Sequence, residues 1–578
     1  MVKPSAVGPA TGNTEGDDFE VRADHVEEGL IRRETVMGDW FDKVHSALED
    51  RSLTLIVGPR GCGKTHMMRF THLRCRDDRS LPLAIYVSFN RYLRLEPLLK
   101  ARSDAGSLFH TWVLARLLIS LHETVERLAD LHSLQPFPDL GFDLTRLQAL
   151  AARLERGIPL SVDEEEDASS LSVEGVVETI RRACQAARRK RSILLMDDAA
   201  LTLTPEFLIE FFDVVRAVKR TDIAPKCSVY PGTTEYGPRF HAEHEGQTLN
   251  VWLSTDHPKY TDIMGQIGRS RYPEGVAGLS PEFNETLMYT AFGVPRAYLS
   301  LVRSVVVAKS EAPQRALNRA IQEHRDAKVS EYQSLEKKVP KFATVVRMGS
   351  LFFDHAVQEI KLANDELAGK REEKQLQIGI EKEEFRGLSK RMIQFLNEAG
   401  LIYEHPEVSH GEDRKYRRFT PHLAALIAGR AFAGRSRGAV AGATVEFLRL
   451  KRTKHPVRKR LETFLPPGAI DSLSIDLPPC QNCSAPRVTN EQKFCINCGT
   501  RLADPSTFTR LMELSVGEVP GLSPFQKAKC EEAGIKTIKD LISLSDPGTE
   551  LRRMHLIGGI RATKIIRTIE AYVDEFLS

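Results

Sequence analysis

The stretch SLTLIVGPRGCGKTHMMRF, residues 52–70, limits the fold of this chain more than any other. Residues 52–57 form a short, apolar, branched run of the kind found in buried parallel strands. A helical pattern follows from His66, so the order is strand, loop, helix. The loop between them fits the pattern G-x-x-x-x-G-K-[ST] in full. Its residues are Gly58, Pro59, Arg60, Gly61, Cys62, Gly63, Lys64 and Thr65.

A loop of this kind predicts a phosphate-binding site. Its glycines let successive backbone N–H groups point into one concavity, and the start of the next helix adds its positive dipole end. Lys64 is expected to reach the β- and γ-phosphates of ATP, and the Thr65 hydroxyl to bind Mg²⁺. The expected nucleotide contacts run from Gly58 through His66. The alternative is a glycine-rich turn that binds no ligand.

A second apolar run, residues 193–196, ends in the acidic pair Asp197 and Asp198. A phosphate-binding loop needs a carboxylate on another strand to hold the metal, so Asp197 is expected beside Mg²⁺. Asp198 is expected to orient or deprotonate the attacking water. Many such ATPases carry Glu at the second position, so the shorter Asp predicts slower hydrolysis or a different placement of the water. The alternative is a surface turn after a core strand.

Two further stretches fit the same site. A short strand over residues 227–230 leads to Gly232-Thr233-Thr234, whose polar groups are placed to sense the γ-phosphate. The stretch GVPRAYL, residues 293–299, opens a helix from which Arg296 is placed to reach back to the phosphates. Three arginines are candidate fingers for the site of a neighbouring subunit, although an exposed arginine is more often a solvated surface residue. They are Arg239, Arg269 and Arg271.

In this order, the loop, the LMDD stretch, the threonine-ended strand and GVPRAYL resemble the AAA+ ATPases over roughly residues 30–310. GVPRAYL looks most like the origin-recognition initiators and the related STAND signalling ATPases. The resemblance implies a core over 29–235 and a helical lid over 236–312. The segment at about 100–180, mostly helical in pattern, is an insertion that departs from this family pattern. The resemblance also implies a homo-oligomer that assembles on nucleotide binding. The catalytic residues that it implies are Lys64, Asp197, Asp198, Thr234 and Arg296.

After a charged helical connector over 313–345, residues 346–432 have the pattern of a winged helix. Apolar residues fall at helical spacing up to Gly400, and two strand-like runs follow as a hairpin. In that fold the helix starting near Leu388 enters a DNA groove and the wing meets phosphates. The expected DNA contacts are Ser389, Lys390, Arg391, Arg414, Lys415, Arg417 and Arg418. The alternative is a winged helix that contacts only protein.

Residues 433–475 form a basic linker or helix, with seven Lys or Arg between 449 and 460. The run is either a stripe for the DNA backbone or a solvated face. Two C-x-x-C pairs follow within 476–505, separated by eleven residues. This spacing resembles zinc ribbons and predicts a closed, structural Zn²⁺ site with no position for a catalytic water. The expected ligands are Cys480, Cys483, Cys495 and Cys498.

The last segment, 510–578, contains two helical pairs with glycine turns. It resembles tandem helix-hairpin-helix units, in which the turn and the following helix hold a DNA phosphate. The expected contacts are Gly558, Gly559, Arg561 and Lys564, with Gly534 and Lys536 as a weaker set. The alternative is a helical module of the same shape that binds protein. The cysteine module is then a spacer that positions this tail.

The bulk properties agree with a multidomain α/β protein. At about 100–200 residues per domain, 578 residues make roughly three to five units. The net charge of +3 neither favours nor excludes nucleic acid. No stretch approaches the roughly 18–20 apolar residues that cross a bilayer. Residues 1–28 are expected to be a disordered lead-in without a secretory signal, and the scattered cysteines favour the reducing cytoplasm.

Three functions remain open on this evidence. The first is an AAA+ ATPase that couples its nucleotide state to assembly on DNA or to remodelling of bound partners. The second is a STAND-type sensor, in which nucleotide is a switch and the tail recognises a protein or a foreign molecule. The third is a mobile-element or defence ATPase that delivers DNA to a partner nuclease or transposase, since the chain carries no nuclease motif of its own.

Overall fold

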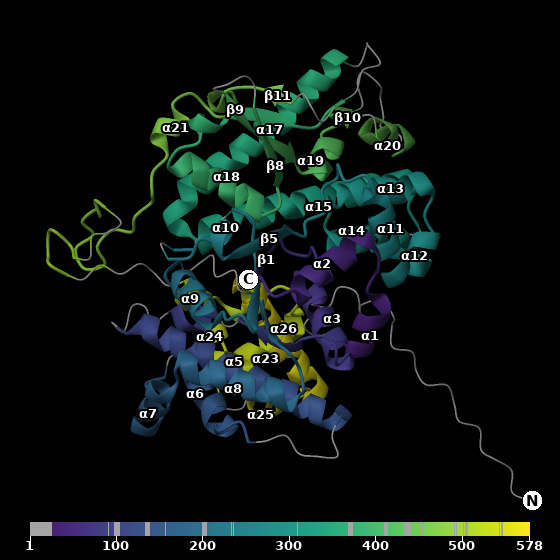
Figure 1. The fold of residues 1–578 in the computed structure, drawn as a ribbon. Helices are drawn as coiled ribbons and strands as arrows, with labels where there is room; N and C mark the ends of the chain where they lie inside the picture. Colours follow the sequence, from purple (N-terminus) through teal and green to yellow (C-terminus); the bar gives the residue numbers. More distant parts are fainter. Residues whose placement is uncertain are drawn as a thin grey trace, which may run out of the picture.

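The computed structural model describes most of the chain (Figure 1). The described residues are 23, 26–90, 92–96, 104–132, 139–156, 158–198, 205–232, 234, 236, 237, 239–308, 310–367, 374–409, 414–432, 441–449, 451, 452, 456–489, 492, 494–500, 502, 507–542, 544 and 547–577. Most of the lead-in expected over 1–28 lies outside the described residues, as does Thr233. Among the described residues, no helix is long and apolar enough to cross a membrane.

A five-stranded parallel sheet lies at the centre of the first half of the chain. Its strands are β1 (Leu53–Val57), β2 (Leu83–Ser88), β3 (Ser192–Asp197), β4 (Ile223–Val229) and β5 (Gly246–Asn250). Their order in the sheet is β2-β3-β4-β1-β5. The apolar runs that predicted buried strands thus form the interior of an α/β layer. The strand that carries Asp197 is separated from the strand before the phosphate loop by β4 alone.

Strand β4 begins earlier than the run expected over 227–230, because it includes Pro225 and Lys226. Proline has no N–H to donate to a neighbouring strand, which usually keeps it out of central strands. The next residue, Lys226, is held by its side chain, because its Nζ donates a hydrogen bond to the Ser52 carbonyl at 2.6 Å. Lys226 also donates to the Ala47 carbonyl at 2.9 Å and to Thr54 Oγ1 at 3.1 Å. These bonds satisfy an ammonium group that is fully buried.

Helices cover both faces of the sheet, and strand residues alternate between them. Ile56 packs in one apolar cluster with α2 (Asp39–Glu49) and α3 (Lys64–Asp77). Leu55 packs in the other cluster, with helices from the expected insertion and α9. Those helices are α5 (Ala105–His132), α6 (Leu144–Glu155), α8 (Val173–Ala186) and α9 (Pro205–Val218). The insertion therefore supplies one of the two layers on the sheet, while the acidic α7 (Val162–Ser170) has no buried residue.

The segment expected as the lid forms α11 (Tyr260–Arg271), α12 (Pro273–Ala277), α13 (Pro281–Thr290) and α14 (Pro295–Val307), after the short α10 (Ala242–Glu245). The connector is helical, as α15 (Pro313–Gln333), α16 (Leu335–Lys338) and the turn η2 (Pro340–Phe342). It is not a free arm, because Leu317, Ile321 and Tyr332 are buried in the cluster that the lid shares with the next unit.

That next unit contains a four-stranded sheet in the order β11-β7-β9-β8. Its elements are α17 (Ala343–Leu367), β6 (Lys374–Gln375), β7 (Ile378–Glu381), η3 (Lys382–Glu384), α18 (Leu388–Glu398), β8 (Ile402–Ser409), β9 (Lys415–Pro421) and α19 (Leu423–Ala428). The basic segment expected as a linker contributes α20 (Ala441–Arg449), β10 (Lys451–Arg452) and β11 (Val457–Arg458). β11 pairs with β7 at the sheet edge, so the linker is part of this unit rather than a tether beyond it.

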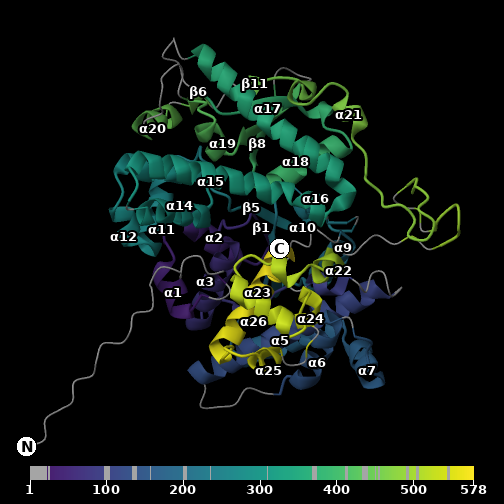
Figure 2. The same cartoon turned by 180° about the vertical axis from the view of Figure 1, so that it is seen from behind.

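The remaining elements are η4 (Leu461–Phe464) and α21 (Ala469–Ser472), then the cysteine segment, which loops out from the side of the molecule in both views (Figures 1 and 2). The C-terminal elements are α22 (Thr507–Met512), η5 (Val516–Glu518), α23 (Pro524–Glu532), α24 (Ile538–Ile542), α25 (Pro547–Arg552) and α26 (Gly559–Leu577). The tail packs back on the first domain, because its apolar core joins the cluster around α5. The Phe508 N–H donates to Glu96 Oε2 at 2.9 Å, where Glu96 follows the turn η1 (Tyr92–Leu95).

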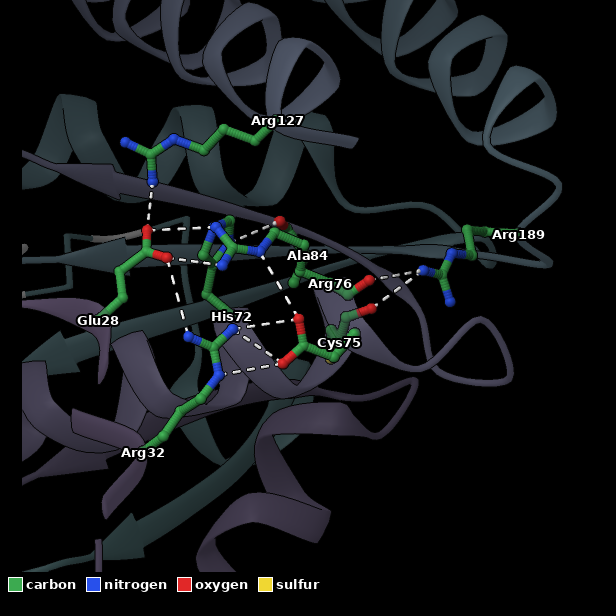
Figure 3. A network of polar contacts seen from close by, with 9 residues as sticks. Glu28, Arg32, His72, Cys75, Arg76, Ala84, Arg127 and Arg189 are labelled. Atoms are coloured by element: carbon green, nitrogen blue, oxygen red, sulfur yellow. Dashed lines mark hydrogen bonds and ion pairs between the residues drawn. The ribbon is translucent and has the colours of Figure 1, made fainter. Parts of the chain in front are cut away.

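A polar network attaches the first helix, α1 (Glu28–Glu34), to the end of α3 (Figure 3). Glu28 lies between Arg76 and Arg127, at 2.6 and 2.9 Å, and the hydrogen bond from Arg76 holds the pKa of Glu28 below its ordinary value. Arg189 donates to the Cys75 carbonyl at 3.1 Å and so caps the last turn of α3. The far end of the helix that begins at the phosphate loop is therefore fixed.

Candidate nucleotide site and candidate DNA surfaces

Two positions of the phosphate loop have a backbone conformation that favours glycine. Gly61 and Gly63 have φ angles of +83° and +95°, in the region that favours glycine. A Cβ atom on Gly58 would lie 2.5 Å from Cys62 Sγ, so the buried Cys62 side chain fills the space beneath the loop. These positive φ angles and close approaches are what a glycine-rich loop of this motif requires.

Lys64 begins α3 and folds over the loop. Its Nζ donates to the carbonyls of Gly58 and Pro59 at 2.5 and 3.2 Å, and lies 4.3 Å from the centre of the Tyr230 ring. The ammonium group is therefore held by the backbone of the loop itself. His66 points elsewhere: its Nε2 lies 2.8 Å from Thr35 Oγ1, and burial lowers its pKa to about 3.

Asp197 is the last residue of β3. It lies at the carboxyl-terminal end of the parallel strands, as does the phosphate loop after β1. It is 1% exposed, and its two oxygens accept hydrogen bonds from Ser228 Oγ at 2.8 Å and Tyr86 Oη at 2.9 Å. Ser228 Oγ also accepts the N–H of Asp198 at 2.9 Å, while Asp198 has a left-handed φ of +53°. One hydroxyl thus orients both members of the acidic pair, and carboxylate oxygens are the ligands that Mg²⁺ prefers.

The two expected sensors, Thr234 and Arg296, differ in what they contact. Thr234 Oγ1 donates to the Tyr230 carbonyl at 2.9 Å, which stabilises the turn after β4. The Arg296 N–H lies 3.4 Å from the Gly61 carbonyl, and a Cβ on Gly61 would lie 3.3 Å from Arg296 Cβ. The GVPR stretch therefore contacts the phosphate loop directly, and the hydrogen bond between them is made by the backbone of Arg296.

The candidate fingers differ in their partners. Arg271 is 12% exposed and pairs with Glu34 at 2.6 Å, and Arg239 pairs with Asp213 at 3.3 Å. Arg269 is exposed on the last turn of α11. Arg271 and Arg239 therefore both pair within their own chain, and the Arg271 side chain is the more buried of the two.

The unit expected to be a winged helix, called the winged-helix unit below, lies against the phosphate loop. A Cβ on Gly400, just after α18, would lie 3.6 Å from Pro59 Cβ, and a Cβ on Gly232, after β4, would lie 3.0 Å from the Gln394 carbonyl in α18. Burial alone would raise the pKa of Glu331 in α15, but Lys328 and Arg60 outweigh it and hold that pKa below its ordinary value. Helix α18 therefore packs near the phosphate loop and the turn after β4, and Glu331 of the connector lies close enough to feel the charge of Arg60 in that loop.

This packing separates the expected DNA contacts of the winged helix into two groups. Ser389 is 2% exposed and donates to the Arg386 carbonyl at 2.9 Å, and the Arg391 guanidinium lies 4.8 Å from the centre of the Phe395 ring. Arg417 pairs with Glu404 at 2.7 Å, and Arg418 donates to the Pro406 carbonyl at 3.0 Å. Three expected contacts remain at the surface: Lys390, Arg414 and Lys415.

The four cysteines come together in two matching turns. Their Sγ atoms all lie within 4.8 Å of one another, close enough to hold one metal ion. In the first turn the Ser484 N–H donates to the Cys480 carbonyl, and in the second the Gly499 N–H donates to the Cys495 carbonyl, both at 2.9 Å. Ser484 and Gly499 both have positive φ, at +56° and +69°. Both turns have the same hydrogen bond and the same positive φ after the second cysteine, so each C-x-x-C pair forms its turn locally. This is why the spacing of the cysteines could predict the cluster.

The glycine turn between α25 and α26 is exposed. No atom lies within 4 Å of a Cβ built on Gly558 or Gly559, so the backbone there is open to a phosphate. Arg561 donates to the Leu556 carbonyl at 2.8 Å, and Lys564 is exposed one turn further along α26. In the first hairpin, Gly534 has a φ of +76° and Lys536 is exposed.

Sequence reasoning missed Ser228 and Tyr86, which hold Asp197, and Tyr230, on which Lys64 lies. The sequence holds one weak signal for Ser228, because it is a polar residue between the apolar Cys227 and Val229. No protein-family model matches the chain, and no curated protein shows significant similarity to it. The function therefore has to be argued from the arrangement of the site.

Proposed function

We propose that this chain is an AAA+-type protein that binds and hydrolyses Mg²⁺ATP and uses its nucleotide state to control how its C-terminal half engages DNA. One observation carries the proposal: the phosphate loop touches the lid at Gly61 and the winged-helix unit at Pro59. A ligand in the loop would therefore alter contacts to both units. This gives a physical route from nucleotide binding to the modules that are candidates for DNA binding.

In this proposal, the loop N–H groups and Lys64 bind the phosphates, and Thr65 and Asp197 hold Mg²⁺. The metal neutralises charge that develops on the transferred phosphoryl group. Ser228 and Tyr86 keep the Asp197 carboxylate in one orientation. Asp198 accepts a proton from the attacking water or orients it.

The cysteine site is proposed to hold a structural Zn²⁺. Four thiolates fill a tetrahedral shell, and the two matching turns bring all four to one point. The segment is too short to bury a core, so metal binding would supply its folding free energy. It would then connect the winged-helix unit to the helical tail as a rigid spacer.

DNA binding is supported by cations that remain exposed in two separate modules. Lys390, Arg414 and Lys415 lie on the winged-helix unit, and Arg561 and Lys564 lie on the tail. Contacts from linked modules to the DNA backbone add in affinity and make binding sensitive to salt.

The proposal is tested with full-length protein, a fluorescent ATP analogue and labelled duplex DNA over a salt series. We expect nucleotide-dependent, salt-sensitive DNA binding, and a loss of nucleotide binding in Lys64→Ala. Lys259→Ala, which removes a surface lysine paired with Asp39, is the matched control. No DNA binding at low salt in any nucleotide state would overturn the proposal.

A second candidate, a STAND-type nucleotide switch, is favoured by the burial of Ser389 and by the packing of α18 on the phosphate loop. There the winged helix reports nucleotide state and the tail binds a protein or foreign ligand. This candidate predicts tightly retained nucleotide after purification and no affinity for DNA. Measuring both properties on one preparation separates the two candidates.

A further inference from the structure

One face of α26 is left to solvent along several turns. Its opposite face is buried through Ala562, Ile565, Ile569 and Val573, which recur at helical spacing in the core of the tail. The exposed face begins with Ile560, whose side chain is 89% exposed. Ile560 adds exposed apolar surface at the start of this face.

The loop between η5 and α23 forms a wall beside this face. Gly521, with a φ of +84°, brings the loop so close that a Cβ on it would lie 3.3 Å from Thr568 Cγ2. The space between loop and helix is an open groove of about 840 Å³. The residues that line it are Pro520, Gly559, Ile560, Thr563, Lys564, Arg567, Thr568 and Tyr572.

The lining combines two kinds of group. Lys564 and Arg567, one helical turn apart, are its charged members, and none of the lining residues is acidic. Pro520, Ile560 and the half-buried Tyr572 supply apolar and aromatic surface. Thr563 and Thr568 complete the lining, and the Thr568 hydroxyl donates to the Lys564 carbonyl at 2.8 Å. Cations beside an aromatic ring are the combination with which proteins hold single-stranded nucleic acid, because phosphate and base face are bound together.

We propose that this groove binds an unpaired nucleotide of single-stranded DNA. Its base lies against Tyr572 and Pro520, and its phosphate lies at Lys564 and Arg567. The inference rests on the proposed DNA binding and adds to it a preference for unpaired bases. The glycine turn at Gly558 offers only backbone N–H groups, which hold duplex and single strand alike. An acidic peptide would pair with the cations but has no flat face for the ring.

The test uses full-length protein and fluorescence anisotropy with three probes: a thymidine homopolymer, the same strand with abasic sites, and a mixed-sequence duplex. We expect the abasic strand to bind about tenfold more weakly than the homopolymer, because base stacking is lost while the phosphates remain. Arg567→Ala should lower the salt slope of single-strand binding by about 0.7 and leave duplex binding unchanged. Arg553→Ala is the control, since this exposed cation pairs with Glu550 outside the groove.

Equal binding of abasic and intact strands would overturn the inference, as would an equal effect of Arg567→Ala on duplex and single strand. Displacement of the homopolymer by polyglutamate more readily than by unlabelled single strand would assign the groove to acidic peptides and overturn it too. Duplex binding that survives these results leaves the proposed function standing. Failure to bind any of the three probes at low salt would remove both.

Discussion

Gly400 lies against Pro59, where a Cβ on the glycine would be 3.6 Å from the proline Cβ. The first residue ends the helix of the winged-helix unit, and the second belongs to the phosphate loop. The two are more than half the chain apart in sequence. Because packed contacts of this kind shift in discrete steps rather than bending continuously, the contact links the loop to the position of α18.

Gly232→Ala is expected to loosen the winged-helix unit from the nucleotide site. The new Cβ would lie 3.0 Å from the Gln394 carbonyl and 3.2 Å from its Cα, so α18 must move. The left-handed φ of +86° adds strain of about 1–2 kcal/mol. We expect a lower melting temperature and faster protease cleavage between the two units.

Gly468→Ala is the control for that experiment, because Gly468 has a φ of +73° but no atom within 4 Å of a built Cβ. It introduces similar strain without a clash. Equal effects of the two substitutions would contradict a specific role for the contact with α18.

Ser228→Ala is expected to slow ATP hydrolysis. It removes the donor to Asp197 and leaves the Asp198 N–H without its acceptor. An unsatisfied buried group costs about 1–3 kcal/mol, and the carboxylate that we propose as a Mg²⁺ ligand loses its orientation. Turnover and melting temperature should both fall. Tyr86→Phe removes only the donor to the other Asp197 oxygen, so its effect on turnover should be smaller. A larger effect of Tyr86→Phe than of Ser228→Ala would contradict the role of Ser228 in orienting Asp197 and Asp198.

Acid is expected to destabilise the first domain through its buried histidines. Burial lowers the pKa of His45 and of His72 to about 4. An unfolded histidine titrates near about 6.5, so between roughly pH 6.5 and 4 the unfolded chain binds protons that the folded chain does not. The free energy of unfolding then falls by roughly 1.4 kcal/mol per pH unit for each histidine, with no contribution above about pH 6.5.

Urea unfolding at about pH 7.5 and about pH 5 measures this dependence. His45→Gln keeps a hydrogen-bonding group beside Thr71, 2.9 Å from the histidine Nδ1, and removes one titrating group. The pH dependence should become shallower in this variant. An unchanged dependence would show that His45 does not titrate on unfolding.

Metal removal is expected to unfold the cysteine segment alone. Cys498→Ser should abolish binding of one Zn²⁺ per chain, measured by elemental analysis, because a closed site needs all four thiolates. The melting temperature of the sheet domain should not change, since the segment lies outside its apolar clusters. Ser484→Gly should retain the metal, because glycine suits the φ of +56° there. Zinc retained in Cys498→Ser would contradict the four-thiolate site.

Local chain geometry made much of the site predictable. The phosphate loop and the two cysteine turns each depend on residues within a few positions of one another, so spacing and glycine placement were enough. The parallel sheet followed from apolar runs too short for helices. In the same way, Asp197 could be placed at a strand end before any contact was known.

Tertiary structure alone decided what those pieces touch. Arg417 reads as a free wing cation in the sequence, but β8 brings Glu404 beside it. Ser228 and Tyr86 meet at Asp197 only because β4 and β2 flank β3. Apolar periodicity tells which face of a helix is buried, but not against what. The packing of α18 on the phosphate loop is therefore a property of the folded chain, set by shape and charge between segments far apart in sequence.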